Sequence, residues 1–110
     1  VVELWPGGGW YTEILAPYLK DGGKLIVTSP DPNGDAESPY VAAAKRFAEK
    51  FSDTSKFGTL TTVIVGNEPF SLGEPGSVDV VLTFRNSHGW YAGNRQEEIY
   101  GAAFAVLKSG

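Results

Sequence analysis

Two kinds of hydrophobic pattern alternate along this chain. Residues 1–4 and 24–28 are short apolar runs with β-branched side chains, which predict strands. Residues 60–65 and 78–84 predict two more strands. The last run is almost uniformly apolar, so we expect its strand to be buried on both faces of a sheet.

Helical signals lie between and after these strands. Residues 10–19 carry apolar side chains at helical spacing. Ser38 followed by Pro39 is typical of a helix start, because Ser caps free backbone N–H groups and Pro tolerates the first helical position. Asn94 and Glu97 have the spacing of an N-cap and a third helical residue, which predicts a last helix beginning there.

The resulting order, β-α-β-α-β-β-α, predicts an α/β fold with a mainly parallel sheet covered by helices on both faces. Ligands of such sheets bind at the carboxyl ends of the strands, where the strand order reverses. We expect that point between the first and fourth strands.

Composition and charge narrow the classes of partner. The chain has 110 residues, which indicates one domain, and contains neither Cys nor Met. Its net charge of −4 argues against a nucleic-acid partner and favours a neutral or cationic small molecule. No membrane-spanning run is present in the sequence. Because the chain has no Cys, disulfide chemistry gives no information about its compartment. We expect a cytoplasmic location, although a signal peptide ahead of Val1 would go unseen.

A glycine-rich loop, Trp5-Pro6-Gly7-Gly8-Gly9-Trp10, joins the first strand to the first helix. Glycine lets backbone N–H groups approach a ligand closely, and the helix start offers positive potential to a carboxylate or phosphate. A tight turn that binds nothing is the alternative. The triphosphate-binding pattern is excluded, because Gly-Lys-Ser/Thr does not follow the loop. A dinucleotide-binding pattern is disfavoured, because Thr12 stands where its third Gly belongs.

Residues 1–19 resemble the first motif of class I S-adenosylmethionine-dependent methyltransferases. The likeness is greatest to a bacterial subgroup of predicted methyltransferases that carries Trp-Pro-Gly-Gly-Gly-Trp-Tyr-Thr. Glu3, Gly7 and Gly9 match the family pattern acid-x-Gly-x-Gly-x-Gly, whereas Trp5 occupies the usual position of the first Gly. The resemblance implies a three-layer, Rossmann-like methyltransferase domain with S-adenosyl-L-methionine as cofactor.

The same resemblance extends to the ends of the second and third strands. Asp31 would bind the ribose hydroxyls; it lies 22 positions after Gly9, close to the roughly 20 expected of a ribose-binding acid. Its position between two prolines also fits a residue that merely ends a strand, and Asp35 is the fallback acid. Asn67, where the family more often has Asp, would contact the adenine.

The resemblance places the methionine part of the cofactor beside the glycine loop. Backbone N–H groups at Gly7, Gly8 and Gly9 would receive its carboxylate, and Pro6, which has no N–H, would adjoin the cofactor. Its ammonium would face Glu3 and the carbonyls near Phe84, with Arg85 adjacent.

The exit of the fourth strand holds further candidates. His88, the only His, suits removal of a proton from the acceptor, or is a loop residue bonded to backbone or water. Arg85 would pair either with an anionic substrate or with Glu97 or Glu98 at the surface. Four aromatic residues could wall the pocket or belong to the ordinary core: Trp10, Tyr11, Trp90 and Tyr91.

The expected function is therefore methyl transfer to a small-molecule acceptor. Two alternatives stay open: an NAD-type oxidoreductase domain and a non-catalytic remnant of the fold. The family's complete sheet has more strands than the four expected here, and Leu-Lys-Ser-Gly at residues 107–110 resembles the family's Leu-Lys-Pro-Gly before a fifth strand. We expect residues 1–110 to be a partial domain that lacks the C-terminal strands and is unstable or inactive alone.

Overall fold

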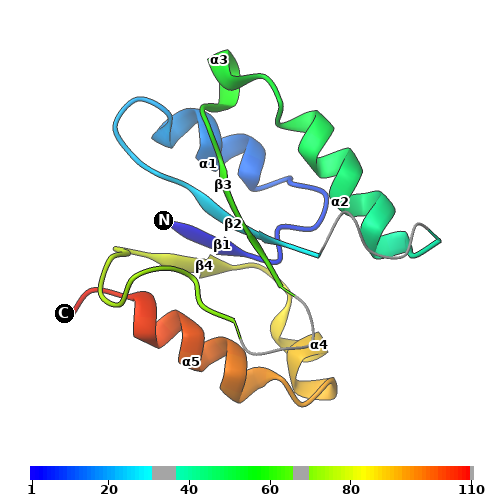
Figure 1. Cartoon of the computed structure of the whole chain (residues 1–110), viewed down its shortest axis with the longest axis vertical. Coiled ribbons are helices and arrows are strands. Elements are labelled where there is room, and N and C mark those ends of the chain that lie inside the picture. Colours follow the sequence, from blue (N-terminus) through cyan, green and yellow to red (C-terminus); the bar gives the residue numbers. More distant parts are fainter. Residues whose placement is uncertain (31–36, 66–69, 110) are drawn as a thin grey trace.

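A computed structural model of the chain describes residues 1–30, 37–65 and 70–109. Its described part contains a four-stranded sheet in the order β3 (Thr61–Ile64), β2 (Ile26–Ser29), β1 (Val2–Leu4) and β4 (Val81–Thr83) (Figure 1). Every neighbouring pair is parallel. The predicted α/β fold with a parallel sheet is confirmed.

The strand order reverses at β1, as predicted. Val2 pairs with Ile26 of β2 on one side and with Val81 of β4 on the other. The carboxyl ends of β1, β2 and β4 therefore lie along the same edge of the sheet, where a parallel α/β fold binds its ligands.

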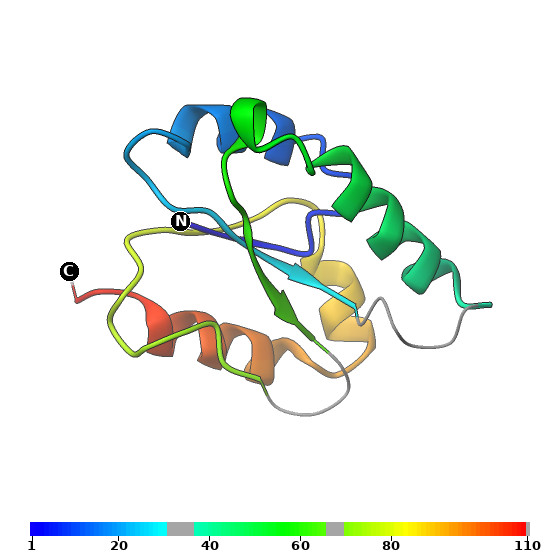
Figure 2. The same ribbon diagram turned by 45° about the horizontal axis from the view of Figure 1, so that its top comes forward.

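Helices cover both faces of the sheet, as Figures 1 and 2 show. One face carries α1 (Thr12–Leu19), α2 (Pro39–Lys50) and the short α3 (Thr54–Phe57). The opposite face carries α4 (Ser87–Ala92) and α5 (Gln96–Val106). This arrangement gives the three layers of a Rossmann-like α/β sheet.

Each face of the sheet has its own hydrophobic core. On the α1–α3 face, the side chain of Val27 is fully buried and packs with Ala16, Leu25, Phe51 and Phe57. The core of the opposite face consists of Val2, Leu4, Ile26, Leu72, Val78, Trp90, Ile99, Ala103 and Val106. Burial on both sides explains why the central strands have almost continuous apolar sequences.

One predicted helix start is correct and the other is wrong. Ser38 caps α2: its side chain accepts a hydrogen bond from the N–H of Tyr40, and Pro39 is the first helical residue. Asn94 does not cap α5, which begins at Gln96. The φ of Asn94 is +56°, a left-handed conformation unlike the extended one of an N-cap, and its N–H donates to the carbonyl of Tyr91. Asn94 therefore belongs to the turn that follows α4, whose C-cap is Gly93.

The fourth strand is shorter and less buried than predicted. It spans Val81–Thr83, and the preceding Val80 remains 42% exposed. Val80 is exposed because β4 lies at the border of the described sheet, where it has β1 as its neighbour on one side. Val78 is buried and forms an isolated parallel bridge with Leu107 after α5.

The described helices are short. Within residues 1–30, 37–65 and 70–109, none combines the length and the apolar character that crossing a bilayer requires.

Candidate ligand-binding site

A cavity of about 260 Å³ opens beside the carboxyl ends of β1 and β2. The glycine loop contributes Trp5, Pro6 and Gly7 to its lining. The end of β2 and the residue after it contribute Thr28, Ser29 and Pro30, and the exits of β3 and β4 contribute Val65 and Asn86. Its volume is near the lower end of the roughly 300–1,000 Å³ typical of small-molecule pockets.

Helix α2 forms an apolar wall of this cavity. Tyr40, Ala43, Ala44 and Phe47 line it from successive turns of the helix. Ala43 and Tyr40 are exposed, whereas Ala44 is buried against the sheet. An apolar and aromatic wall suits the flat apolar part of a ligand.

The backbone of the glycine loop alternates in the sign of φ. Trp5, Gly7 and Gly9 have φ values of +48°, +61° and +86°, whereas Pro6 and Gly8 between them are not in the positive region. Such alternation turns successive N–H groups toward one side and forms an anion-binding concavity. Among the described residues, the N–H groups of Gly7 and Gly8 donate no hydrogen bond.

Trp5 takes a conformation that a tryptophan rarely adopts, at the position where the resembling family usually has Gly. Its N–H donates to Thr28 Oγ1 at 2.8 Å, and its carbonyl accepts from Asn86 Nδ2 at 3.1 Å. Its ring packs edge-on against Trp90 and Phe70, with centroid distances of 5.3 and 6.2 Å. These contacts compensate for the backbone strain at Trp5.

Gly9 is required by packing. A Cβ at this position would lie 2.5 Å from Phe51 Cε2 and 3.0 Å from Phe47 Cε2. Gly9 therefore allows α2 to approach the loop closely, while no atom outside its immediate neighbours comes within 4 Å of a Cβ at Gly7 or Gly8. Pro6 and Gly7 line the cavity; Gly8 and Gly9 do not.

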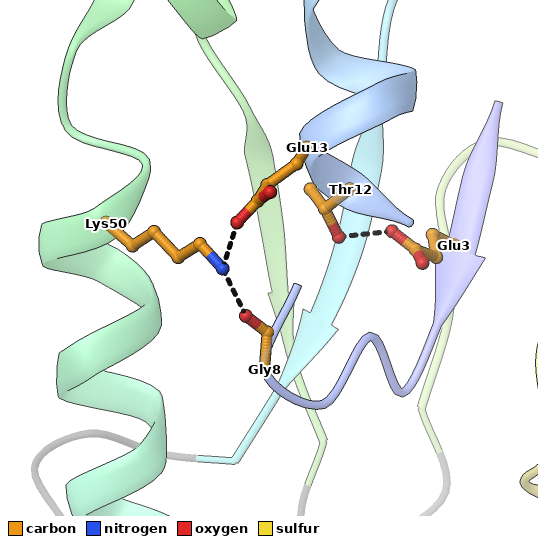
Figure 3. A network of polar contacts seen from close by, with 5 residues as sticks. All are labelled: Glu3, Gly8, Thr12, Glu13 and Lys50. Carbon is orange, nitrogen blue, oxygen red and sulfur yellow. Dashed lines mark hydrogen bonds and ion pairs between the residues drawn. The ribbon is translucent and has the colours of Figure 1, made fainter. Parts of the chain in front are cut away.

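Glu3 is buried and joins β1 to α1. Its side chain is 1% exposed, and Thr12 Oγ1 donates a hydrogen bond to Glu3 Oε1 at 2.5 Å (Figure 3). Burial raises the pKa of the Glu3 carboxyl above its ordinary value, and the hydrogen bond from Thr12 opposes that rise. Glu3 does not line the cavity. Its observed contact supports the start of α1, and a direct contact with an ammonium stays a prediction.

The candidates after β4 lie outside the cavity lining. Phe84 stacks on Tyr11 with a centroid distance of 3.8 Å. Arg85 and His88 are exposed, and the φ of Arg85 is +63°. Among the described residues, the expected surface pair of Arg85 with Glu97 or Glu98 is not formed; Glu98 pairs with Arg95 instead, with Nη2 and Oε1 3.1 Å apart.

The predicted aromatic wall is also different. The four aromatic residues considered, Trp10, Tyr11, Trp90 and Tyr91, are absent from the cavity lining, and Trp90 belongs to the core. The aromatic side chains that do line the cavity are Trp5, Tyr40 and Phe47. The glycine loop turns Trp5 inward, which sequence spacing alone did not reveal.

Asp31, the expected ribose-binding acid, its fallback Asp35, and Asn67, expected at the adenine, lie outside the described residues. Their described neighbours Pro30 and Val65 both line the cavity.

Sequence reasoning missed the polar side chains at the strand ends. Thr28 and Ser29 end the second apolar run, and Asn86 follows the fourth. Asn86 Nδ2 donates to the carbonyls of Leu4 and Trp5, each at 3.1 Å, and thereby ties the end of β1 to the exit of β4. A polar residue just after an apolar strand in a parallel sheet is the signal that could have found them.

No family model, no curated protein and no solved structure matches this chain. In residues 1–30, 37–65 and 70–109, no group of three His, Asp or Glu side chains is arranged to hold a metal ion.

Proposed function

We propose that this chain binds S-adenosyl-L-methionine and belongs to an enzyme that transfers its methyl group to a small-molecule acceptor. One observation carries the proposal: a cavity at the carboxyl ends of β1 and β2 is bounded by a glycine loop with alternating φ and by an apolar helix wall. The resemblance of residues 1–19 to the first methyltransferase motif supports the same ligand.

The residues around the cavity fit the parts of this cofactor. The N–H groups of Gly7 and Gly8 are available to a carboxylate, as is the positive end of α1. Ala44 and Phe47 offer an apolar surface to a purine base. The hydroxyl of Ser29 and the side-chain oxygen of Asn86 are additional polar groups in the lining.

S-Adenosyl-L-methionine supplies an already activated methyl group, so the protein's contribution is to hold the two reactants in line and exclude water. In this proposal the glycine loop fixes the amino-acid end of the ligand and α2 fixes the nucleoside end. His88 is the proposed acceptor of a proton from the substrate, since its imidazole is exposed near the exit of β4.

The structure of the α1 start disfavours the dinucleotide alternative. In a dinucleotide-binding loop, a third Gly lets the helix pack closely on the strand. Here Thr12 occupies that place, is fully buried, and hydrogen-bonds to Glu3 of β1. Close packing of α1 on β1 therefore depends on a polar contact between side chains.

Calorimetric titration with S-adenosylhomocysteine and, separately, with NAD tests the proposal. We expect S-adenosylhomocysteine to bind and NAD not to bind. Ala43→Trp should abolish binding, because Ala43 is exposed yet lines the cavity, so a large side chain fills it without entering the core. Ala48→Trp, an exposed position on α2 outside the lining, is the matched control.

Three outcomes would overturn the proposal. Binding of NAD alone favours the oxidoreductase alternative, and binding of neither ligand favours a remnant of the fold. Equal binding by the Ala43→Trp and Ala48→Trp variants places the ligand outside this cavity.

A further inference from the structure

Lys50, the last residue of α2, reaches across to the glycine loop. Its Nζ donates a hydrogen bond to the carbonyl of Gly8 at 3.0 Å and forms an ion pair with Glu13 of α1 (Figure 3). One ammonium thus joins three separate segments: the end of α2, the middle of the loop and the first turn of α1.

The contact from Lys50 holds a peptide group that is also fixed on its other side. The carbonyl of Gly8 accepts from Lys50, and the N–H of Gly9 in the same peptide group donates to the carbonyl of Pro6 at 3.0 Å. This peptide group directly follows the N–H groups of Gly7 and Gly8, so holding it restricts the loop that carries them.

Side-chain packing does not hold the loop at Gly7 and Gly8. Gly7 and Gly8 are exposed, and no atom lies within 4 Å of a Cβ at either position. Glycine has wide conformational freedom, so an unsupported stretch of this kind would populate several conformations. The polar contact from Lys50 restricts it, together with the hydrogen bond from the N–H of Gly9 to the carbonyl of Pro6.

The ion pair has a second effect on the same loop. Glu13 lies in the first turn of α1, where its carboxylate would repel an anionic group approaching the helix start. The ion pair with Lys50 offsets the negative charge of the Glu13 carboxylate and so weakens this repulsion.

From this geometry we infer that Lys50 is a positioning residue, which orders the glycine loop for a ligand that carries a carboxylate. The inference rests on the proposed function. A loop that is already ordered binds more tightly, because binding then costs less conformational entropy. Lys50 does not itself line the cavity, so its effect on the ligand is indirect.

The test compares Lys50→Met with Lys45→Met. Lys45 lies on the same helix and is exposed, and its side chain makes no ion pair or hydrogen bond with the described residues. We expect Lys50→Met to speed amide exchange at Gly9, whose buried N–H donates to Pro6, in the free protein and to weaken S-adenosylhomocysteine binding by about three- to tenfold. Both variants should melt at nearly the same temperature, because exposed ion pairs contribute little to global stability.

Two further variants separate the contacts of Lys50. Lys50→Arg should restore both slow exchange and affinity, because a guanidinium can donate to a carbonyl and a carboxylate together. Glu13→Gln should keep exchange slow, since the hydrogen bond to Gly8 persists.

The outcomes distinguish this inference from the proposed function. A wild-type chain that does not bind S-adenosylhomocysteine overturns the proposed function and the ligand part of the inference, while amide exchange still decides whether Lys50 orders the loop. Loop exchange and affinity that are the same in Lys50→Met and Lys45→Met overturn the inference, even if the wild type binds.

Discussion

Thr28 of β2 accepts a hydrogen bond from the N–H of Trp5, the first residue after β1, with Oγ1 and N separated by 2.8 Å. The contact joins two neighbouring strands at the point where β1 ends and the glycine loop begins. It also stabilises Trp5 in its left-handed conformation. A side chain one residue before the end of β2 therefore helps to hold the start of the loop that leaves β1.

Replacing Thr28 with Val tests this contact. The change keeps the shape of the side chain but leaves the N–H of Trp5 without its acceptor in a half-buried position. We expect the free energy of unfolding to fall by about 1–3 kcal/mol. Urea unfolding measures it. Thr28→Ser keeps the hydroxyl and should lose less; equal losses in the two variants would show that the hydrogen bond is not the cause.

Gly9 and Gly8 offer a matched pair of substitutions. Gly9→Ala would bring a Cβ into the rings of Phe51 and Phe47 at a φ of +86°, so we expect a loss of about 2–4 kcal/mol in unfolding free energy. Gly8→Ala meets no atom within 4 Å and has no positive φ, so it should change stability by less than about 1 kcal/mol. Thermal unfolding of both variants decides the matter, and an equally stable Gly9→Ala variant would contradict the observed packing.

The buried carboxyl of Glu3 predicts a pH dependence. Burial is the larger influence and raises its pKa in the folded chain above the ordinary value of 4.5. The folded state then binds this proton more tightly than the unfolded state does. The contribution of Glu3 to stability is therefore greatest below pH 4.5 and declines as the pH rises through the folded-state pKa.

Glu3→Gln isolates this effect, because Gln keeps an oxygen that can accept from Thr12 but does not ionise. The free energy of unfolding of the variant minus that of the wild type should increase from pH 4 toward neutrality and then level off. Urea unfolding at a series of pH values provides the curve. A difference that is flat across this range, or that declines, would contradict the assigned cause.

Asn86 provides a test of the link between β1 and β4. Its amide donates to the carbonyls of Leu4 and Trp5, so Asn86→Asp would place a carboxylate against two carbonyl oxygens. We expect this variant to be less stable than Asn86→Ala by about 1–2 kcal/mol, because it adds repulsion to the lost hydrogen bonds. If the two variants unfold at the same denaturant concentration, the amide does not bridge these strands.

Local signals in the sequence predicted much of the fold. Short apolar runs located β1, β2 and β3, and their alternation with helical stretches predicted the parallel order. Ser38 and Pro39 marked the start of α2 because capping depends on adjacent residues. Asp53 could have marked α3 in the same way, since its side chain accepts from the N–H of Ser55.

The failures have tertiary causes. Asn94 has the residue type and spacing of an N-cap, but the turn between α4 and α5 requires a left-handed residue there. The apolar run of the fourth strand suggested burial on both faces, yet its place beside β1 at the border of the described sheet leaves Val80 exposed.

The candidate site was only partly predictable. The glycine loop was found from its composition, but the separate roles of Gly7 at the cavity and Gly9 against Phe51 depend on how α2 docks. The contributions of Asn86 and Lys50 depend on contacts between distant parts of the chain. No pattern in adjacent residues reports such contacts.

In the proposed function, the glycine loop and the cavity beside it receive a nucleoside that carries an amino acid. The most direct measurement is a titration of the isotopically labelled chain with S-adenosylhomocysteine, followed by amide nuclear magnetic resonance. We predict that the backbone N–H resonances of Gly7 and Gly8 and the side-chain amide of Asn86 shift together and saturate at one affinity. Saturable shifts that leave these three groups unchanged, or no shifts at all, would contradict the claim.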